Sequence, residues 1–314
     1  MVIDNEFYMS LALEEAWKYQ GLTYPNPAVG CTVVGEHGEI LAVEAHKKAG
    51  TPHAEVNALK VAYYKLTSDK DILHVEKSVD IHEYLKRNHK NIFENCSIYT
   101  TLEPCSFVGK TPACADLIQA LNIKKVYIGS HDKYQYDFNF HAEFGVLERK
   151  CDELLEPFNL WQKDKFVFFK WAQRLDGSTH GEVSSFNSRK NVHAMRDVCD
   201  LLVIGGNTVR QDRPTLDARY VDGKAPDILI YSRQKEFDKT IALFNVPDRK
   251  VIISDNLDEI NNYKNIMIEG TAKMMELTKE ITDFHLCYLH VADKFEHLNT
   301  KKDAQDIITW IKRK

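Results

Sequence analysis

Three short segments in the first half of the chain carry residue types that bind zinc. They are His53-Ala54-Glu55, Pro104-Cys105, and Cys114, which follows Cys105 by nine residues. Zinc in proteins prefers four tetrahedral ligands from Cys and His, and a catalytic site leaves one of the four positions for water. One histidine and two cysteines leave that single position. The set therefore predicts a catalytic zinc site.

Glu55 lies two residues beyond His53, at the predicted start of a helix, where it can reach a zinc-bound water without ligating the metal. This arrangement suits hydrolytic deamination. Zinc lowers the pKa of water, the hydroxide attacks an amidine carbon, and the glutamate carries protons to the departing ammonia. A lone His-x-Glu or a lone buried cysteine is usually structural, so only the combination favours a site. We interpret the other five cysteines as structural: Cys31, Cys96, Cys151, Cys199 and Cys287.

The elements that must position these residues alternate between helices and strands. For the first half we predict helices over 7–20, 54–64 and 113–121, a hairpin of 31–34 with 40–43, and strands over 97–101 and 125–129. Residues 65–95 are rich in Lys, Asp, Glu and His, and they predict a helical surface insertion. The alternation favours an α/β layer architecture.

A second alternating series follows a polar interval at 159–165. It predicts strands over 166–170, 201–204, 227–231, 250–253, 265–268 and 284–291, with helices over 187–198 and 271–281. The polar interval is the best domain boundary. We therefore expect two domains, 1–158 and 165–314.

Composition narrows the class of protein. The 314 residues are 44% hydrophobic and 28% charged, which is typical of a globular chain of two ordinary domains. The net charge of −5 disfavours a protein held to nucleic acid by phosphate contacts. No apolar run reaches the roughly 18 residues of a membrane span, and the N-terminus lacks a signal-peptide pattern. Seven cysteines favour a reducing, cytoplasmic setting over a disulfide framework.

Over nearly its whole length the chain resembles the family of bifunctional riboflavin-biosynthesis deaminase–reductases. The N-terminal segments that carry the resemblance are Asn26-Pro27-Ala28-Val29-Gly30-Cys31, His46, Ala49-Gly50-Thr51-Pro52-His53-Ala54-Glu55-Val56-Asn57-Ala58-Leu59, Thr101-Leu102-Glu103-Pro104-Cys105-Ser106, Gly109-Lys110-Thr111-Pro112 and Cys114. Eight residues separate the two cysteines. Cytidine and tRNA-adenosine deaminases have two residues there, so the longer gap points to the riboflavin branch.

The resemblance implies a cytidine-deaminase-like, three-layer α/β/α domain. The zinc ligands it implies are His53, Cys105 and Cys114, with Glu55 as the proton shuttle, and it suggests substrate contacts from Asn26, His46, Lys110 and Asp132. A lysine suits a substrate phosphate as a point charge. Two positions depart from the family pattern: Phe107 stands where His is usual, and Asp132-Lys133-Tyr134 replaces Asp-Pro-Asn.

From Lys170 onward the chain looks like the reductase half of the same family, which has a dihydrofolate-reductase-like α/β fold. The matching segments include Lys170-Trp171-Ala172, Leu175-Asp176-Gly177, Met195-Arg196, Val203-Ile204-Gly205-Gly206-Asn207-Thr208-Val209 and Glu269-Gly270. The resemblance implies NADPH contacts from Lys170, Ala172, Thr208, Asp212, Gly270 and Thr271. It also implies contacts with the phosphoribosyl substrate from Arg196, Leu216, Arg219 and Glu269. This half departs further from the pattern, with Ser185-Phe186-Asn187 for Trp-Ile-Thr and Glu269-Gly270-Thr271 for Glu-Gly-Gly.

The implied activity is zinc-dependent deamination of 2,5-diamino-6-(5-phosphoribosylamino)pyrimidin-4(3H)-one, followed by NADPH-dependent reduction of its ribosyl group to ribityl. We expect a cytoplasmic homo-oligomer, a dimer or a tetramer. Three alternatives stay open. The second domain could be inactive or bind substrate only, the chain could be a tRNA deaminase, or it could be a non-enzymatic protein on a decayed deaminase–reductase fold.

Overall fold

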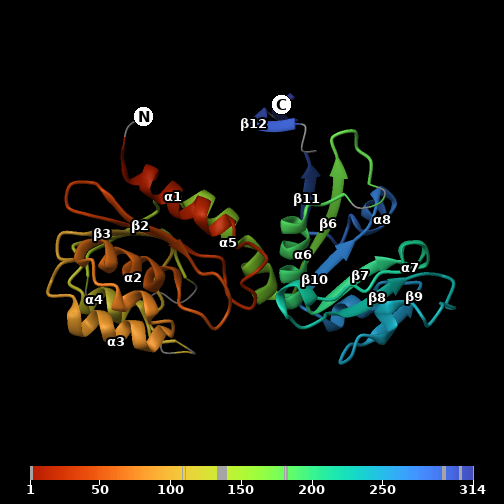
Figure 1. Cartoon of the computed structure of the whole chain (residues 1–314), viewed down its shortest axis with the longest axis horizontal. Helices are drawn as coiled ribbons and strands as arrows, with labels where there is room; N and C mark the ends of the chain where they lie inside the picture. The colour runs from red at the N-terminus through yellow and green to blue at the C-terminus, as the bar shows by residue number, and fades with distance from the viewer. Residues whose placement is uncertain are drawn as a thin grey trace. The chain divides into compact units, whose positions relative to one another are not determined.

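The computed structural model describes residues 3–107, 109, 111–132, 140–179, 181, 183–291, 295–303 and 306–313. The chain divides into two compact units, Met1–Lys163 and Asp164–Lys314, each with its own sheet and its own core (Figure 1). Within the described ranges, no helix combines the length and the apolar character needed to span a bilayer.

The first unit is built on a five-stranded sheet with the order β2-β1-β3-β4-β5. Its strands are β1 (Gly30–Val34), β2 (Ile40–Ala45), β3 (Ser97–Leu102), β4 (Lys125–Ser130) and β5 (Ala142–Phe144). β1 runs antiparallel to β2 and β3, whereas β3, β4 and β5 run parallel. The predicted hairpin and both predicted strands of this half are thereby confirmed.

Helices cover both faces of this sheet (Figure 1). Helices α1 (Asn5–Trp17) and α5 (Glu148–Lys163) contribute to one core, and α2 (Ala54–Thr67), α3 (Ser78–Asn88) and α4 (Cys114–Ala120) contribute to the other. Successive side chains of a strand point to opposite faces. Accordingly Ile98 of β3 lies in the core of α2 to α4, and its neighbour Tyr99 lies in the core of α1 and α5. The predicted three-layer α/β/α architecture is confirmed.

The segment 65–95 is not the surface insertion that its composition predicts. Ile72, Ile81, Leu85 and Phe93 are at most 1% exposed and belong to the larger core of the unit. The charged residues of α3 lie on its outer side, and its opposite side is buried. The overall polar composition of the segment therefore gives no indication of this apolar face. This segment is therefore part of the folding unit.

The second unit contains a six-stranded sheet with the order β11-β6-β10-β7-β8-β9, in which every pairing is parallel. The strands are β6 (Phe166–Arg174), β7 (Leu201–Gly205), β8 (Asp227–Tyr231), β9 (Val251–Ser254), β10 (Asn265–Glu269) and β11 (Phe284–His290). Parallel sheets bury both faces, and this explains the continuous apolar runs in the sequence. All six predicted strands are present.

The helices of this unit are α6 (Phe186–Val198), α7 (Gly206–Asp212) and α8 (Ala272–Thr278). Together with the sheet they give the predicted α/β class of the C-terminal domain. Strands β7, β8 and β9 follow one another on one side of β6, and β10 then inserts between β6 and β7. The order in which strands are added to the sheet therefore reverses at β10. Open α/β sheets bind ligands at the carboxyl ends of the strands, at such a switch point.

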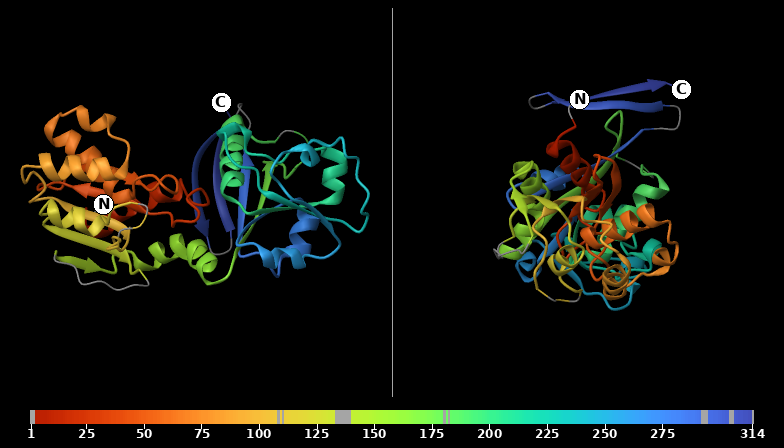
Figure 2. Two further views of the ribbon diagram at one scale, coloured as in Figure 1. Left: turned by 90° about the horizontal axis from the view of Figure 1, so that it is seen from below. Right: turned by 90° about the vertical axis from the view of Figure 1, so that its left-hand side faces the viewer.

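Five helices and strands of the structure differ from the sequence prediction. Helix α5, strand β5 and helix α7 were not expected, and neither was the hairpin of β12 (Phe295–Asp303) and β13 (Asp306–Arg313), which forms a separate two-stranded sheet (Figure 2). The predicted boundary at 159–165 is mostly the last turn of α5, and the two units divide after Lys163.

Candidate active site

The three predicted zinc ligands come from three separate elements of the first unit. His53 is the N-cap residue of α2, Cys114 is the first residue of α4, and Cys105 lies in the loop after β3. The loop is tied to α4 because the backbone N–H of Cys114 donates to Cys105 Sγ at 3.3 Å, and the N–H of Ala115 donates to the Cys105 carbonyl at 3.1 Å. Both helix N-termini favour negative charge, which stabilises thiolates beside them.

The positions of these side chains fit a zinc ion. His53 Nδ1 lies 3.4 Å from Cys114 Sγ and 3.6 Å from Cys105 Sγ, and one ligand atom from each residue lies within 4.8 Å of the others. A tetrahedral zinc with bonds of about 2.05 Å to nitrogen and about 2.3 Å to sulfur separates the two atom types by about 3.6 Å. The observed separations match this value. The hydrogen bond between the two thiols lowers the pKa of Cys105 to about 4, and together with burial it raises the pKa of Cys114 well above its ordinary value. The pair therefore holds one thiolate, on Cys105, and zinc binding would have to release the proton of Cys114.

A threonine holds the ring of His53 in the orientation that ligation needs. Thr111 Oγ1 lies 3.3 Å from His53 Nε2, so the far nitrogen of the ring has a partner and Nδ1 faces the two sulfurs. Zinc-binding histidines generally donate their second ring N–H to such an acceptor. The sequence offers no signal for this role, because Thr111 lies 58 positions from His53.

Replacing Thr111 with valine is expected to lower zinc affinity by about ten- to a hundredfold, the usual effect of losing a partner of a metal-binding histidine. Thr111→Ser keeps the hydroxyl and should bind zinc as the parent does. Competition with a fluorescent chelator measures both variants. Equal zinc affinity in the valine variant and the parent would contradict the proposed role.

Glu55 lies in the first turn of α2 and is only 4% exposed. Burial raises the pKa of Glu55 to about 7, although the neighbouring His53 opposes the shift. A carboxyl group with a pKa near the working pH can both accept and return a proton. It is not needed as a ligand, because His53, Cys105 and Cys114 already complete the set predicted for an open catalytic site.

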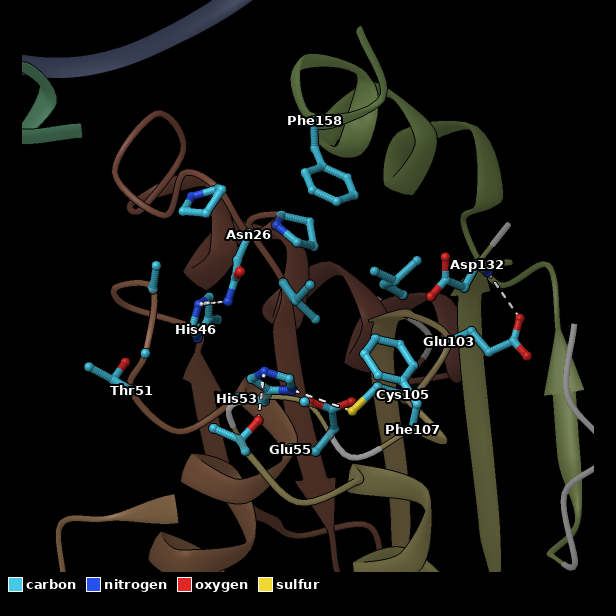
Figure 3. Close-up of a pocket in the computed structure, with 18 of the residues that line it drawn as sticks. Asn26, His46, Thr51, His53, Glu55, Glu103, Cys105, Phe107, Asp132 and Phe158 are labelled. Atoms are coloured by element: carbon cyan, nitrogen blue, oxygen red, sulfur yellow. Dashed lines mark hydrogen bonds between the residues drawn. The ribbon is translucent and has the colours of Figure 1, made fainter. Parts of the chain in front are cut away.

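Two of the three predicted zinc ligands, His53 and Cys105, line a pocket of about 360 Å³ in the first unit (Figure 3). Asn26, His46 and Asp132, which were predicted to contact substrate, all line it together with His53 and Glu55. The structure therefore brings these predicted residues to one place. The fourth predicted substrate residue, Lys110, lies outside the described residues, and so do Lys133 and Tyr134.

Two predicted residues of the pocket bind each other. His46 is 2% exposed, and its Nδ1 and Nε2 lie 3.1 Å from the Pro52 carbonyl and 3.1 Å from Asn26 Nδ2. Burial lowers the pKa of His46 to about 4, so the ring is neutral near pH 7. A neutral ring with one donor and one acceptor satisfies both contacts when Nδ1–H donates to Pro52 and Nε2 accepts from Asn26. The side-chain oxygen of Asn26, Oδ1, can accept a hydrogen bond from a ligand, whereas the backbone carbonyl of Asn26 already accepts from Thr23 Oγ1 at 2.9 Å.

Other pocket residues were missed from the sequence. Glu103 is 4% exposed, and its carboxylate accepts the backbone N–H of Asp132 at 3.0 Å, which fixes the start of the loop after β4. Phe158 comes from α5, a helix that local sequence patterns do not predict. Phe107, the departure from the family pattern, is 53% exposed and lines the pocket beside Cys105 (Figure 3).

In the second unit two predicted substrate residues form an ion pair that is largely buried. Arg196 Nη2 of α6 lies 2.9 and 3.1 Å from the two carboxylate oxygens of Glu269, at the carboxyl end of β10. Their side chains are 11% and 14% exposed. Burial alone would raise the pKa of Glu269, but the charges of Arg196 and Lys170 outweigh it and the pKa is lowered. The pair is therefore charged at neutral pH.

Most of the remaining predicted residues of this unit lie near that same edge of the sheet. Lys170 is the register partner of Glu269, and Ala172 follows it on β6. Thr208 and Asp212 lie on α7 directly after β7, and Gly270 and Thr271 lie between β10 and α8. Leu216 is 5% exposed, and Arg219 Nη1 lies 2.7 Å from Asp217 Oδ1.

Removing Arg196 would leave the Glu269 carboxylate buried without its main partner. We expect Arg196→Ala to lower the free energy of unfolding of this unit by about 3–5 kcal/mol. Hydrogen exchange of the β10 amides measures this loss of stability in the second unit without interference from the first unit. Arg219→Ala is the matched control, because its ion pair is half exposed and should contribute at most about 1 kcal/mol. Similar losses in both variants would refute the assignment of a buried pair.

The two units of the chain match two different families of known protein domains. Residues 2–130 match the sequence profile of the cytidine and deoxycytidylate deaminase zinc-binding region, and residues 165–309 match that of the RibD C-terminal domain. Riboflavin biosynthesis protein RibD of Aquifex aeolicus (strain VF5) is 32% identical over 265 residues, which cover 78% of this chain and 67% of that protein. The RibD of Escherichia coli (strain K12) is 27% identical over 250 residues, covering 74% and 60%. The chain thus spans between 60% and 67% of the length of these two relatives.

Solved structures share the fold over almost the whole chain. A diaminohydroxyphosphoribosylaminopyrimidine deaminase/5-amino-6-(5-phosphoribosylamino)uracil reductase from Thermotoga maritima matches with a TM-score of 0.62 and 24% identity, covering 98% of each chain. RibD of Acinetobacter baumannii matches with a TM-score of 0.60 and 21% identity, covering 99% of each chain.

Proposed function

Because this chain belongs to the RibD family of riboflavin biosynthesis proteins, we propose that it performs two successive reactions on one phosphoribosyl pyrimidine. The first is hydrolytic removal of the 2-amino group of 2,5-diamino-6-(5-phosphoribosylamino)pyrimidin-4(3H)-one. The second is reduction of its ribosyl group to ribityl with NADPH. The deaminase domain would occupy 1–158 and the reductase domain 165–314.

The observation that carries the proposal is the set of His53, Cys105 and Cys114 at zinc-binding separations beside the buried carboxyl group of Glu55. Zinc held there would supply Lewis-acid activation of a water molecule. Glu55 would take a proton from that water and return it to the amino group that leaves as ammonia. Asn26 and Asp132 would orient the substrate in the pocket, with His46 holding the Asn26 amide in place.

The second reaction is assigned to the carboxyl ends of β6, β7 and β10. Lys170, Ala172, Thr208, Asp212, Gly270 and Thr271 would hold NADPH, which supplies a hydride. Arg196, Leu216, Arg219 and Glu269 would bind the phosphoribosyl group. Both arginines have a carboxylate partner, but the Arg196 side chain is 11% exposed and the Arg219 side chain is 53% exposed, so Arg219 is the arginine that is better placed to meet the phosphate.

Two assays on the parent protein test the proposal. Ammonia release from the diaminopyrimidine phosphate reports the first reaction, and the loss of NADPH absorbance with the deaminated pyrimidine phosphate reports the second. We expect both. Deamination without NADPH oxidation would mean that the second domain is inactive or only binds substrate, and the absence of both would overturn the proposed function.

We further propose that the protein works as a homo-oligomer, a dimer or a tetramer, in the cytoplasm. All seven cysteines are free thiols, and two of them are the zinc ligands proposed above, so a reducing compartment suits the chain. Light scattering of the purified protein tests the assembly, and fractionation of the source cells tests the compartment.

A further inference from the structure

The segment 214–219 has a defined shape although residues 214–218 belong to no helix or strand. Four successive carbonyls in it are bound by donors from distant parts of the chain. Pro214 accepts from the backbone N–H of Leu243 at 3.1 Å, and Asp217 accepts from Arg196 Nη1 at 3.4 Å. The carbonyls of Thr215 and Leu216 lie between these two. The whole segment is thus fixed from outside.

Both middle carbonyls are bound by one side chain, Arg249, which lies just before β9. Its Nη1 donates to Thr215 at 2.8 Å and its Nη2 donates to Leu216. Leu216 has a φ of +57°, a left-handed conformation that non-glycine residues adopt only when their surroundings impose it. The planar fork of the guanidinium, engaged on two adjacent carbonyls, supplies that constraint.

Arg249 also belongs to a cluster of charged side chains in the second unit. Burial lowers the pKa of Arg249 to about 10, so the guanidinium stays charged at neutral pH. The charges of Asp217 and Arg196 both act on it, which places it in the same charge cluster. Arg219, at the end of the segment, pairs with Asp217.

We propose that Arg249 is a positioning residue for the reductase substrate: it holds the 214–219 segment in the shape that presents Leu216 and Arg219 to the phosphoribosyl group. This inference rests on the proposed function of the second unit. Lysine cannot replace arginine here, because a single ammonium group does not reproduce the two-pronged contact.

The test compares Arg249→Lys and Arg249→Met with the parent in NADPH oxidation. We expect the KM for the deaminated pyrimidine phosphate to rise about tenfold in the lysine variant and further in the methionine variant, with kcat within about twofold of the parent. Ammonia release by the first unit should not change, and NADPH affinity, measured by fluorescence titration, should stay the same. Arg213→Lys is the matched control, because its half-exposed contacts with Asp238 and Thr240 lie outside the segment.

A lower kcat with an unchanged KM in the lysine variant would indicate a purely structural role and overturn the proposal, and so would unchanged kinetics. If the methionine variant does not fold, the KM and kcat of the lysine variant alone test the positioning role of Arg249. If the parent does not oxidise NADPH, the proposed function has failed, and ribose 5-phosphate binding by calorimetry then tests Arg249 separately. Equal affinity of the parent and Arg249→Lys for that probe would overturn the positioning role.

Discussion

Replacing Glu55 with glutamine is expected to lower the rate of deamination by at least about a hundredfold and to leave the zinc bound. Glutamine keeps the size of the side chain but cannot take up and return a proton, and removal of a general acid–base group costs about 10²- to 10⁴-fold. Zinc should remain because the three predicted ligands do not include Glu55. Metal analysis and ammonia release on the same preparation measure both quantities.

The second unit provides an internal control for this variant. Glu55→Gln, given the deaminated pyrimidine phosphate, should oxidise NADPH at close to the parental rate, since the reductase residues lie in a separate compact unit. Glu44→Gln, on β2 and paired with Lys47, should leave both activities unchanged. Loss of zinc in Glu55→Gln would make Glu55 a ligand or a structural residue. Loss of both activities with zinc retained would mean that the two units depend on each other.

Cys114→Ser should lose both zinc and deamination. An alcohol is a far poorer zinc ligand than a thiolate, so the site would keep only His53 and Cys105. We expect zinc to fall from one ion per chain to a small fraction of that after dialysis, and ammonia release to fall below detection. Metal analysis by mass spectrometry measures the first and a coupled ammonia assay measures the second.

Cys96→Ser is the matched control for this variant. Cys96 is also buried, at 3% exposed, but it packs in the core away from the zinc ligands' hydrogen bonds, and its thiol donates to the carbonyl of Ile92 at 3.9 Å, a bond that a hydroxyl can replace. It should therefore keep its zinc. Full zinc occupancy in Cys114→Ser would refute the ligand assignment, and zinc loss in both variants would mean that the metal depends on the packing of the core.

Much of the fold could be predicted because local patterns carry it. The apolar runs that follow Asp200 and Lys264 predict strands correctly, because parallel strands buried on both faces have little room for polar residues. Helix α5 was missed because its sequence is strongly charged and contains Pro157, both of which argue against a helix when read locally. Its apolar residues Leu154 and Cys151 nevertheless pack into the core of the first unit.

The candidate zinc site could be predicted because its residue types are rare and its spacing is specific. The contacts between distant residues in the two candidate sites could not be predicted, since they depend on which elements become neighbours in the fold. Thr111 meets His53 across 58 positions, and Arg196 meets Glu269 across 73. No local period relates such residues. Only the strand order, with β10 placed beside both β6 and β7, brings Glu269 to its partner.

The strand order of the second unit also determines when its sheet can be completed during synthesis. β6 is the first strand made, yet both of its neighbours are late: Phe166 pairs with Asn265 of β10, and Phe168 with Phe284 of β11. Until the ribosome has released those strands, the apolar side chains of β6 have no sheet to join. Such non-local pairing slows folding and exposes the nascent chain to aggregation. A fragment that stops before Asn265 would therefore leave β6 without either partner strand, and chaperone dependence should be concentrated in this unit.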